Sequence, residues 1–212
     1  MWAQPASVGY KRITMSVSAR PGPPSAALTL LAANVLVLSS ALARLGVSPL
    51  EAAVFEALHD LPGPVGLLLL VVTPLGSGVA AVVAPGVALA VDRRLAVRLA
   101  LAAPGAWVIA NLLKVAVARG RPADLLADVV TAVGAGGSGF PSGHTAVAVA
   151  LAATVWPALG GRGRWVVGTI AGLVALARVE HGVHLPLDLV GGAAIGLLTA
   201  AAAAAVTIRR RR

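Results

Sequence analysis

The chain of 212 residues contains no cysteine and has few charged or aromatic residues. Without cysteine it has no disulfide framework, no thiolate nucleophile and no Cys-ligated zinc or iron–sulfur site. Only 12% of its residues are charged, against roughly 25% in a typical soluble domain, which excludes an ordinary cytosolic globule. The apolar residues, 58% of the chain, occur in long blocks, which excludes a disordered, collagen-like or coiled-coil chain. With a mean hydropathy of +0.89, the remaining class is an integral membrane protein.

Six predominantly apolar segments predict membrane-spanning helices, each of which needs about 20 residues. The second is broken by prolines and glycines but is too short for two crossings, so it predicts one tilted or kinked helix. A cleaved signal peptide is the alternative interpretation of the first, although that run is long for one. We therefore predict an all-α bundle of six transmembrane helices. The predicted spans are residues 26–43, 65–91, 95–113, 143–159, 165–177 and 187–208.

The segments outside the spans carry most of the polar residues. We expect residues 1–25, which are basic and end in a proline-rich stretch, to form a flexible cytoplasmic tail. Residues 26–208 are expected to form the six-span domain, and residues 209–212 a second basic tail. Residues 44–63 mix ionisable and apolar side chains, which predicts a loop with a short amphipathic helix at the membrane interface.

The chain is strongly basic, with 17 Lys and Arg against 8 Asp and Glu and a formal net charge of +9. In a soluble chain this would indicate a nucleic-acid partner, but in a membrane chain it more often encodes orientation. With both termini in the cytoplasm, most of the basic residues lie in cytoplasmic segments, so we adopt that orientation and expect no nucleic-acid partner. The exceptions, on the other side, are Arg44, Lys114, Arg119, Arg121 and Arg178.

Most of these outward cations adjoin span ends, where a charge in hydrocarbon costs up to about 2.5 to 3.5 kcal/mol, so they call for an anionic partner. Between them the fourth span opens with Pro141-Ser142-Gly143-His144. A helix that starts behind a proline presents free N–H groups and the positive end of its dipole, and such a start can bind a phosphate. Gly143 lets an anion approach the backbone, and Ser142 can add a hydroxyl donor.

A second chemical pattern follows the fifth span. His184 and Asp188 are four residues apart, so if a helix begins near Pro186 the carboxylate reaches one imidazole nitrogen and leaves the other free to attack. His184 and His144 on one membrane face can supply a nucleophile and an acid for phosphoryl transfer, while the cations neutralise the phosphoryl oxygens. Such a site needs neither a metal nor a cofactor.

Together these residues resemble the type 2 phosphatidic acid phosphatase superfamily, which also contains bacterial acid phosphatases and vanadium haloperoxidases. The signature is a lysine, six residues and Arg-Pro; then Pro-Ser-Gly-His; then arginine, five residues, histidine, three residues and aspartate. One departure is Ala177, where the family often has serine. The chain carries the three motifs, in order and at the family's internal spacings, as Lys114…Arg121-Pro122, Pro141-Ser142-Gly143-His144 and Arg178…His184…Asp188.

The resemblance implies a bacterial-type lipid phosphatase of the plasma membrane. It implies that His184 is the nucleophile that forms a phosphohistidine, that Asp188 orients it, and that His144 protonates the leaving alcohol. The expected substrate is a lipid phosphate or diphosphate, such as undecaprenyl diphosphate, phosphatidylglycerol phosphate or phosphatidic acid, cleaved at the extracytoplasmic face. By the same resemblance the phosphate is held by Lys114, Arg121, Ser142, Gly143 and Arg178.

Two alternative functions stay open at this point. A lipid phosphotransferase of the same superfamily would differ only in the acceptor that attacks the phosphohistidine. A non-catalytic anion-binding transporter would use the same cations without turnover, and it would use discontinuous helices in repeated halves. Pro74 and Pro85 in the second predicted span favour a transporter, whereas no inverted repeat is visible in the sequence.

The other polar positions receive structural interpretations. We expect Arg119 to be an ordinary interface cation, His181 to be solvated and His59 to lie in a wet loop without a partner. Glu180 is expected to pair with Arg178, the glycine-rich run 134–139 to be a flexible loop, and Asp124 and Asp128 to share a solvated helix face. The small residues between 191 and 196 are explained by close helix packing.

Overall fold

The chain folds into helices and loops. The computed structural model describes residues 25–59, 61–134 and 136–209, and within these ranges it contains no strand. The predicted tails, 1–25 and 209–212, lie almost wholly outside the described residues. The helices are α1 (Ala26–Ala43), α2 (Pro49–His59), α3 (Gly63–Val72), α4 (Gly78–Leu89), α5 (Arg93–Val117), α6 (Pro122–Leu125), α7 (Gly143–Val155), α8 (Gly161–Glu180) and α9 (Pro186–Arg209), with short 3-10 helices η1 (Thr73–Gly76) and η2 (Trp156–Ala158).

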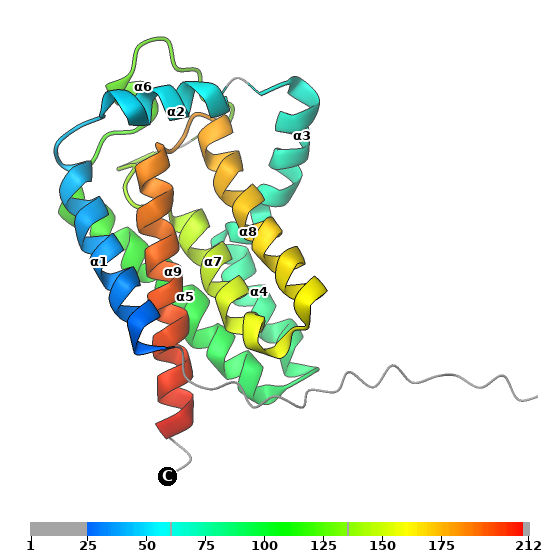
Figure 1. Ribbon diagram of the computed structural model, residues 1–212. Coiled ribbons are helices and arrows are strands. Elements are labelled where there is room, and N and C mark those ends of the chain that lie inside the picture. The colour runs from blue at the N-terminus through cyan, green and yellow to red at the C-terminus, as the bar shows by residue number, and fades with distance from the viewer. Residues whose placement is uncertain (1–24, 60, 135, 210–212) are drawn as a thin grey trace, which may run out of the picture.

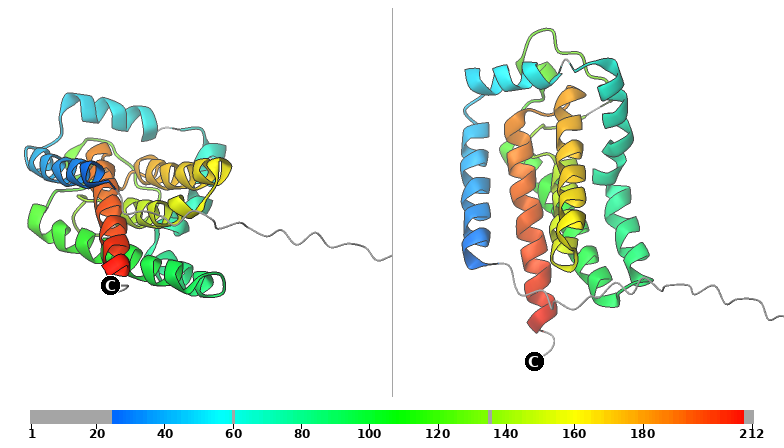
Figure 2. Two further views of the ribbon diagram at one scale, coloured as in Figure 1. Left: turned by 60° about the horizontal axis from the view of Figure 1, so that its bottom comes forward. Right: turned by 45° about the vertical axis from the view of Figure 1, so that its right-hand side comes forward.

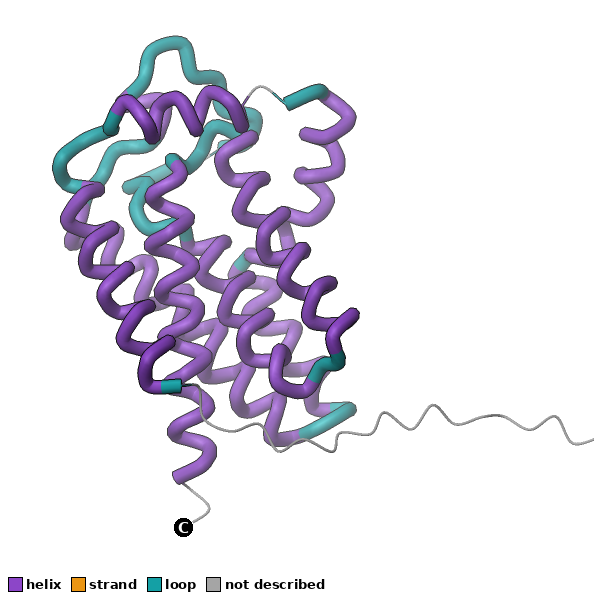
Figure 3. Tube along the Cα trace, viewed as in Figure 1, coloured by secondary structure: helices purple, strands orange, loops and turns teal. Residues whose placement is uncertain are grey.

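The long helices run side by side as one bundle, and α2 lies across one end of it (Figure 1). Figure 2 shows the same arrangement from two further sides, with α1 and α9 neighbours along the bundle. The longest loops gather at the end covered by α2 (Figure 3). The first residues of α1 lie at the opposite end, where α9 also finishes. The end under α2 therefore collects the segments that carry the sequence motifs.

The predicted spans correspond to the helices with one clear difference. Helix α1 has the predicted bounds, and the Ser25 side chain caps it by accepting a hydrogen bond from the Leu28 N–H at 3.3 Å. The second predicted span is two helices, α3 and α4, separated by the 3-10 turn η1, rather than one kinked helix. Pro74 has no N–H to continue the α-helical ladder, and Ser77 starts α4 by capping the Ala80 N–H at 3.3 Å.

The structure supports a helical membrane protein, but it does not by itself give six spans. Three helical segments of the described chain are long and apolar enough to cross a bilayer: Ala26–Ala43, Arg93–Leu125 and Pro186–Thr207. A fourth would be counted if Pro49–His59 and Gly63–Gly76, which are bent by 98° relative to each other, formed one broken span. The apolar helices Gly78–Leu89 and Gly143–Ala158 are shorter. The helices present many leucine and valine side chains outward, as a lipid environment allows.

The centre of the bundle is built from small residues of α5, α7 and α9. Close approach of helix backbones is the usual way in which transmembrane helices pack, and it is tightest between α7 and α9. A Cβ on Gly192 would lie 2.5 Å from the Ser142 carbonyl oxygen, and one on Gly196 would lie 2.6 Å from that of Ala146. The expected role of these glycines is confirmed, and the contact places the start of α7 against the start of α9. The buried cluster comprises Ala102, Ala106, Ala110, Ala146, Ala150, Ile195 and Ala203.

Candidate active site

The three sequence motifs meet at the bundle end that α2 covers. The Ser142 N–H donates to the Asp188 carbonyl oxygen at 2.9 Å, which joins the second motif to the third. The Arg121 Nη1 donates to the Val183 carbonyl oxygen at 2.7 Å, which joins the first motif to the third. His144 lies near enough to Lys114, Arg178 and His184 for their charges to act on its imidazole. One cluster therefore holds residues that are up to 74 positions apart in the chain, from Lys114 to Asp188.

His184 and Asp188 form a buried pair. Helix α9 begins at Pro186, so Asp188 lies in its first turn and its Oδ2 reaches back to the His184 Nδ1 at 3.2 Å. The Leu185 N–H also donates to Oδ2, at 2.9 Å, which fixes the carboxylate. His184 is 2% exposed and Asp188 is fully buried. Because the carboxylate can only accept a hydrogen bond, Nδ1 carries the ring proton and the Nε2 of His184 has the free lone pair.

The charge state of His184 follows from its surroundings. Burial lowers the pKa of the His184 imidazole from 6.5 to about 4, and the charges of Lys114 and Arg121 act in the same direction. The hydrogen bond and the charge of Asp188 oppose this shift without cancelling it. His184 is therefore neutral at pH 7, which is the form a nitrogen nucleophile needs.

The start of α7 has the form of an anion site. Ser142 is the N-cap of this 13-residue helix, and its buried Oγ accepts from the Thr145 N–H at 3.4 Å and from the Thr145 Oγ1 at 3.1 Å. With both bonds accepted, the proton of the Ser142 hydroxyl is free to donate. A Cβ built on Gly143 would meet nothing within 4 Å, so the backbone has room for an anion beside it. His144 lies half-buried in the first turn.

The cations of the first and third motifs surround this helix start. Arg178 is 6% exposed, and its Nε has no hydrogen-bond partner among the described residues. Lys114 donates from Nζ to the Ser138 carbonyl oxygen at 2.6 Å. A buried cation with unused donors is costly in a protein interior unless an anion joins it. Arg178 is therefore the group that most clearly lacks its partner.

Arg121 is held by the loop that precedes α7. Its Nε donates to the Gly137 carbonyl oxygen at 2.9 Å and its Nη2 to that of Gly136 at 2.8 Å. The glycine-rich run thus turns carbonyl groups towards the cation instead of only connecting two helices. At Gly139 a Cβ would lie 2.8 Å from the Gly120 carbonyl oxygen and 3.1 Å from the Asp188 Oδ2. Glycine is required there because two loops and the buried carboxylate converge.

Arg119 is not the ordinary interface cation that the sequence suggested. Its side chain is 2% exposed and forms an ion pair with Glu51 on α2, Nη2 to Oε2 at 2.6 Å. Its Nη1 pairs with the Asp188 Oδ1 at 3.0 Å. Glu51, which our sequence interpretation did not single out, also accepts from the Leu187 N–H at 3.0 Å. Arg119 and Glu51 therefore hold the carboxylate that binds His184.

His181, Glu180 and His59 also differ from expectation. His181 is 2% exposed rather than solvated, and burial lowers the pKa of its imidazole. The Glu180 Oε2 lies 3.2 Å from the His181 Nε2, and among the described residues no ion pair joins Glu180 to Arg178. His59 ends α2 instead of lying in a loop, stacks on Phe55, and its Nδ1 is 2.8 Å from the Glu180 carbonyl oxygen. The His59 side chain therefore ties the end of α8 to α2.

Asp124 and Asp128 do not share a helix face. Helix α6 ends at Leu125, and Asp128 has a left-handed backbone with φ of 58°. The Asp124 Oδ2 accepts from the Arg121 N–H at 2.8 Å, so this acid stabilises the turn that carries Arg121. Within the described residues, no group of three or more His, Asp or Glu side chains is placed to hold a metal ion.

The fold and the site define a class: a helical membrane protein with a buried His–Asp pair beside a cationic helix start. A sequence profile described as the PAP2 superfamily matches residues 95–212. This match covers more than half of the chain and includes all three motifs, so the chain belongs to the PAP2 superfamily.

Two solved structures share this fold. One is LpxE from Aquifex aeolicus, with 24% sequence identity and a TM-score of 0.69, over 76% of this chain and 96% of that one. The other is the transmembrane PAP2 type phosphatidylglycerolphosphate phosphatase from Bacillus subtilis, with 20% identity and a TM-score of 0.70. That match covers 87% of this chain and 98% of the other. A comparison with curated protein sequences gives no match.

Proposed function

We propose that the chain is a membrane lipid phosphatase that hydrolyses a lipid phosphate monoester or diphosphate through a phosphohistidine. The observation that carries this proposal is the neutral, buried His184, held by Asp188 with its Nε2 free, beside a cationic helix start. Nucleophile, orienting carboxylate and phosphate-binding donors are the components that phosphoryl transfer needs. Membership of the PAP2 superfamily supports the same conclusion.

The proposed reaction has two steps. In the first, the His184 Nε2 attacks phosphorus and the bond to the leaving oxygen breaks. That oxygen takes a proton from His144, whose protonated form is stabilised by the negative charge of the bound phosphate. In the second, His144 takes a proton from a water molecule whose oxygen attacks phosphorus, and the P–N bond breaks. His184 is restored and inorganic phosphate is released. Asp188 accepts a hydrogen bond from the Nδ1–H throughout and stabilises the positive charge that forms on the ring.

The charge that develops on the phosphoryl oxygens needs donors that are already in place. We assign this role to Lys114, Arg121 and Arg178 together with the Ser142 hydroxyl and the Gly143 N–H. Arg178 supports the assignment because its buried Nε has no partner among the described residues. Arg121 supports it differently: three carbonyl oxygens fix its guanidinium and leave further N–H groups for a substrate.

A lipid substrate agrees with the position of the site at one end of an apolar bundle. A headgroup can lie there while its hydrocarbon remains in the bilayer. One of the two solved relatives is titled a transmembrane PAP2 type phosphatidylglycerolphosphate phosphatase, which is the name of an enzyme that acts on a lipid phosphate. With six spans, the positive-inside distribution of charge favours both termini in the cytoplasm and the site at the extracytoplasmic face of the plasma membrane.

The deciding experiment is phosphate release from phosphatidic acid, phosphatidylglycerol phosphate and undecaprenyl diphosphate by the purified protein, with EDTA present. The native chain should release phosphate from at least one of them, and His184→Ala should not. Asp92→Asn, which changes a residue that caps α5 far from the site, is the control and should retain activity. Undiminished release by His184→Ala, or abolition by EDTA, would overturn the mechanism.

A further inference from the structure

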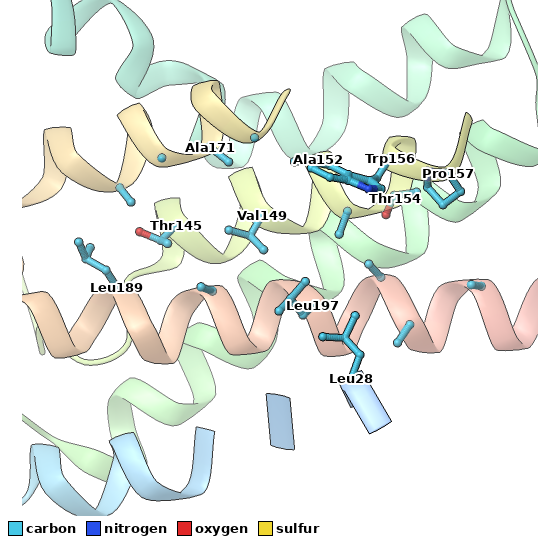
Figure 4. Close-up of a pocket in the computed structure, with 18 of the residues that line it drawn as sticks. Leu28, Thr145, Val149, Ala152, Thr154, Trp156, Pro157, Ala171, Leu189 and Leu197 are labelled. Carbon is cyan, nitrogen blue, oxygen red and sulfur yellow. The ribbon is translucent and has the colours of Figure 1, made fainter. Parts of the chain in front are cut away.

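A long apolar groove runs along the bundle between α7, α8 and α9 (Figure 4). Its volume is about 740 Å³. Helices α8 and α9 both pack on α7, but among the described residues they make few contacts with each other. Small residues on the two facing walls, such as Gly172 on α8 and Ala193 on α9, leave the space between them open.

One end of the groove adjoins the candidate active site. Thr145, which lines that end, donates from Oγ1 to the Ser142 Oγ at 3.1 Å. Leu189 on the opposite wall directly follows Asp188. A phosphate at the start of α7 would therefore have the mouth of the groove about one helical turn, or roughly 5 Å, away.

A charged residue lies at the other end of the groove. Arg98 of α5 lines it, and its Nε donates to the Thr207 Oγ1 at 2.9 Å. Along α7 the groove extends from Thr145 to Trp156, which is about 17 Å of helix. One leaflet of hydrocarbon is about 15 Å deep, half of the ~30 Å core. The groove is therefore long enough to hold one hydrocarbon chain of a lipid whose headgroup lies beside the site.

We propose that this groove binds one hydrocarbon chain of the substrate while the phosphate of the same molecule lies against His184. This inference rests on the proposed function and adds the position and approximate length of the chain that the protein recognises. Lipid tails are as apolar as the groove, so little is gained by transfer alone. The groove therefore selects by shape: a chain that fills it is held in register with the nucleophile. A membrane lipid that fills the groove without taking part in turnover is the alternative occupant.

Gly172 offers a direct test because a Cβ built on it meets nothing within 4 Å. Gly172→Leu would place a side chain in the groove about 9 Å along α8 from Arg178. Gly86 on α4 is also exposed, also has nothing within 4 Å of an added Cβ, and does not line the groove. Gly86→Leu is therefore the matched control. Ala193→Leu blocks the groove from the opposite wall.

The measurement is kcat/KM for a series of monoalkyl phosphates, from butyl to hexadecyl, in detergent micelles. For the native chain and Gly86→Leu, kcat/KM should rise with chain length until the groove is filled. For Gly172→Leu and Ala193→Leu the rise should stop at a shorter chain, so that the ratio of hexadecyl to butyl phosphate falls about tenfold. Native-like activity of a variant towards butyl phosphate also shows that the variant is folded.

Two contrary results would separate the two proposals. If both groove variants follow the native profile at every chain length, the groove holds only bulk lipid and the inference is wrong, while the phosphatase proposal stands. If the native chain releases phosphate neither from this series nor from the three lipids named under the proposed function, the phosphatase proposal is wrong, and the chain-binding inference is wrong with it.

Discussion

The carboxylate of Asp188 lies between two cationic or potentially cationic groups, and the guanidinium of Arg119 is one of them. Arg119 Nη1 meets Oδ1 at 3.0 Å, while the His184 Nδ1 is 3.2 Å from Oδ2. Arg119 is itself held by Glu51 of the surface helix α2. A chain of charges thus runs from the interface helix to the proposed nucleophile, and Arg119 and Glu51 are positioning residues that act through Asp188.

The first prediction concerns the stability of this buried network. Arg119→Met leaves the Glu51 and Asp188 carboxylates uncompensated, and breaking a buried pair costs about 3–5 kcal/mol in the free energy of unfolding. Glu51→Gln should also lower the free energy of unfolding, but the variant with both changes should lose less than the sum of the two single losses. Denaturant unfolding in detergent measures the free energy of unfolding of the three variants, and additive losses would contradict a direct coupling.

The same network should also affect the kinetics. Glu51→Gln should lower kcat more than it raises KM, because it disturbs the His184–Asp188 pair and not a substrate contact.

The second prediction concerns the orientation of His184. Asp188→Asn keeps the shape of the side chain but removes the charge that selects the Nδ1–H tautomer. In a Ser-His-Asp triad the same change lowers kcat about 10⁴-fold, and we expect a loss of about 10³-fold or more in phosphate release here. Asp92→Asn is the control, because Asp92 caps α5 far from the site and asparagine caps equally well. A mild loss in Asp188→Asn would exclude a tautomer-selecting role.

The third prediction concerns the protonation of His184. With a pKa of about 4, its ring should stay neutral down to roughly pH 5 and become charged near pH 4. NMR of the ¹⁵N-histidine-labelled protein measures this titration, and the signal that disappears in His184→Gln identifies the residue. An unfolded histidine takes up its proton near pH 6.5. Between pH 6.5 and 4 the unfolded chain therefore binds more protons, so His184 makes the folded state less stable as pH falls through this window. A midpoint near 6.5 in the folded protein would contradict the buried environment.

The sequence was informative where a local spacing carries the geometry. His184 and Asp188 are four residues apart, and the start of α9 at Pro186 brings the carboxylate onto the ring as predicted. The membrane helices were also predictable, because apolar runs need no partner to be recognised. The break of the second span was only half predicted. Pro74 indicated a kink, but the chain forms two separate helices joined by η1. Gly76 in η1 packs closely on α7, where a Cβ would lie only 2.5 Å from the His144 carbonyl oxygen.

Arg119 and Glu51 were not predictable in the same way. They are 68 residues apart in the chain, and each looks like a common charged residue near a membrane interface. Only the crossing of α2 over the bundle end brings them together. The sequence did offer one indication of a role for Arg119, because it lies two positions before Arg121 in a segment already expected to face an anion. His181 was misjudged for the same reason, since its burial depends on how α8 meets α2 and α3.

The last prediction concerns which side of the membrane holds the site, and the lack of cysteine in the chain makes it simple to test. Ala127→Cys places a single thiol in the exposed loop at the site end, and Gly160→Cys places one at the exposed turn before α8. An added Cβ at Gly160 meets nothing within 4 Å, so the change should not disturb the fold. In intact cells a membrane-impermeant maleimide should label Ala127→Cys and should label Gly160→Cys only after lysis. The native chain gives the unlabelled baseline. The reverse pattern would place the site in the cytoplasm, and the positive-inside distribution of charge would then not set the orientation.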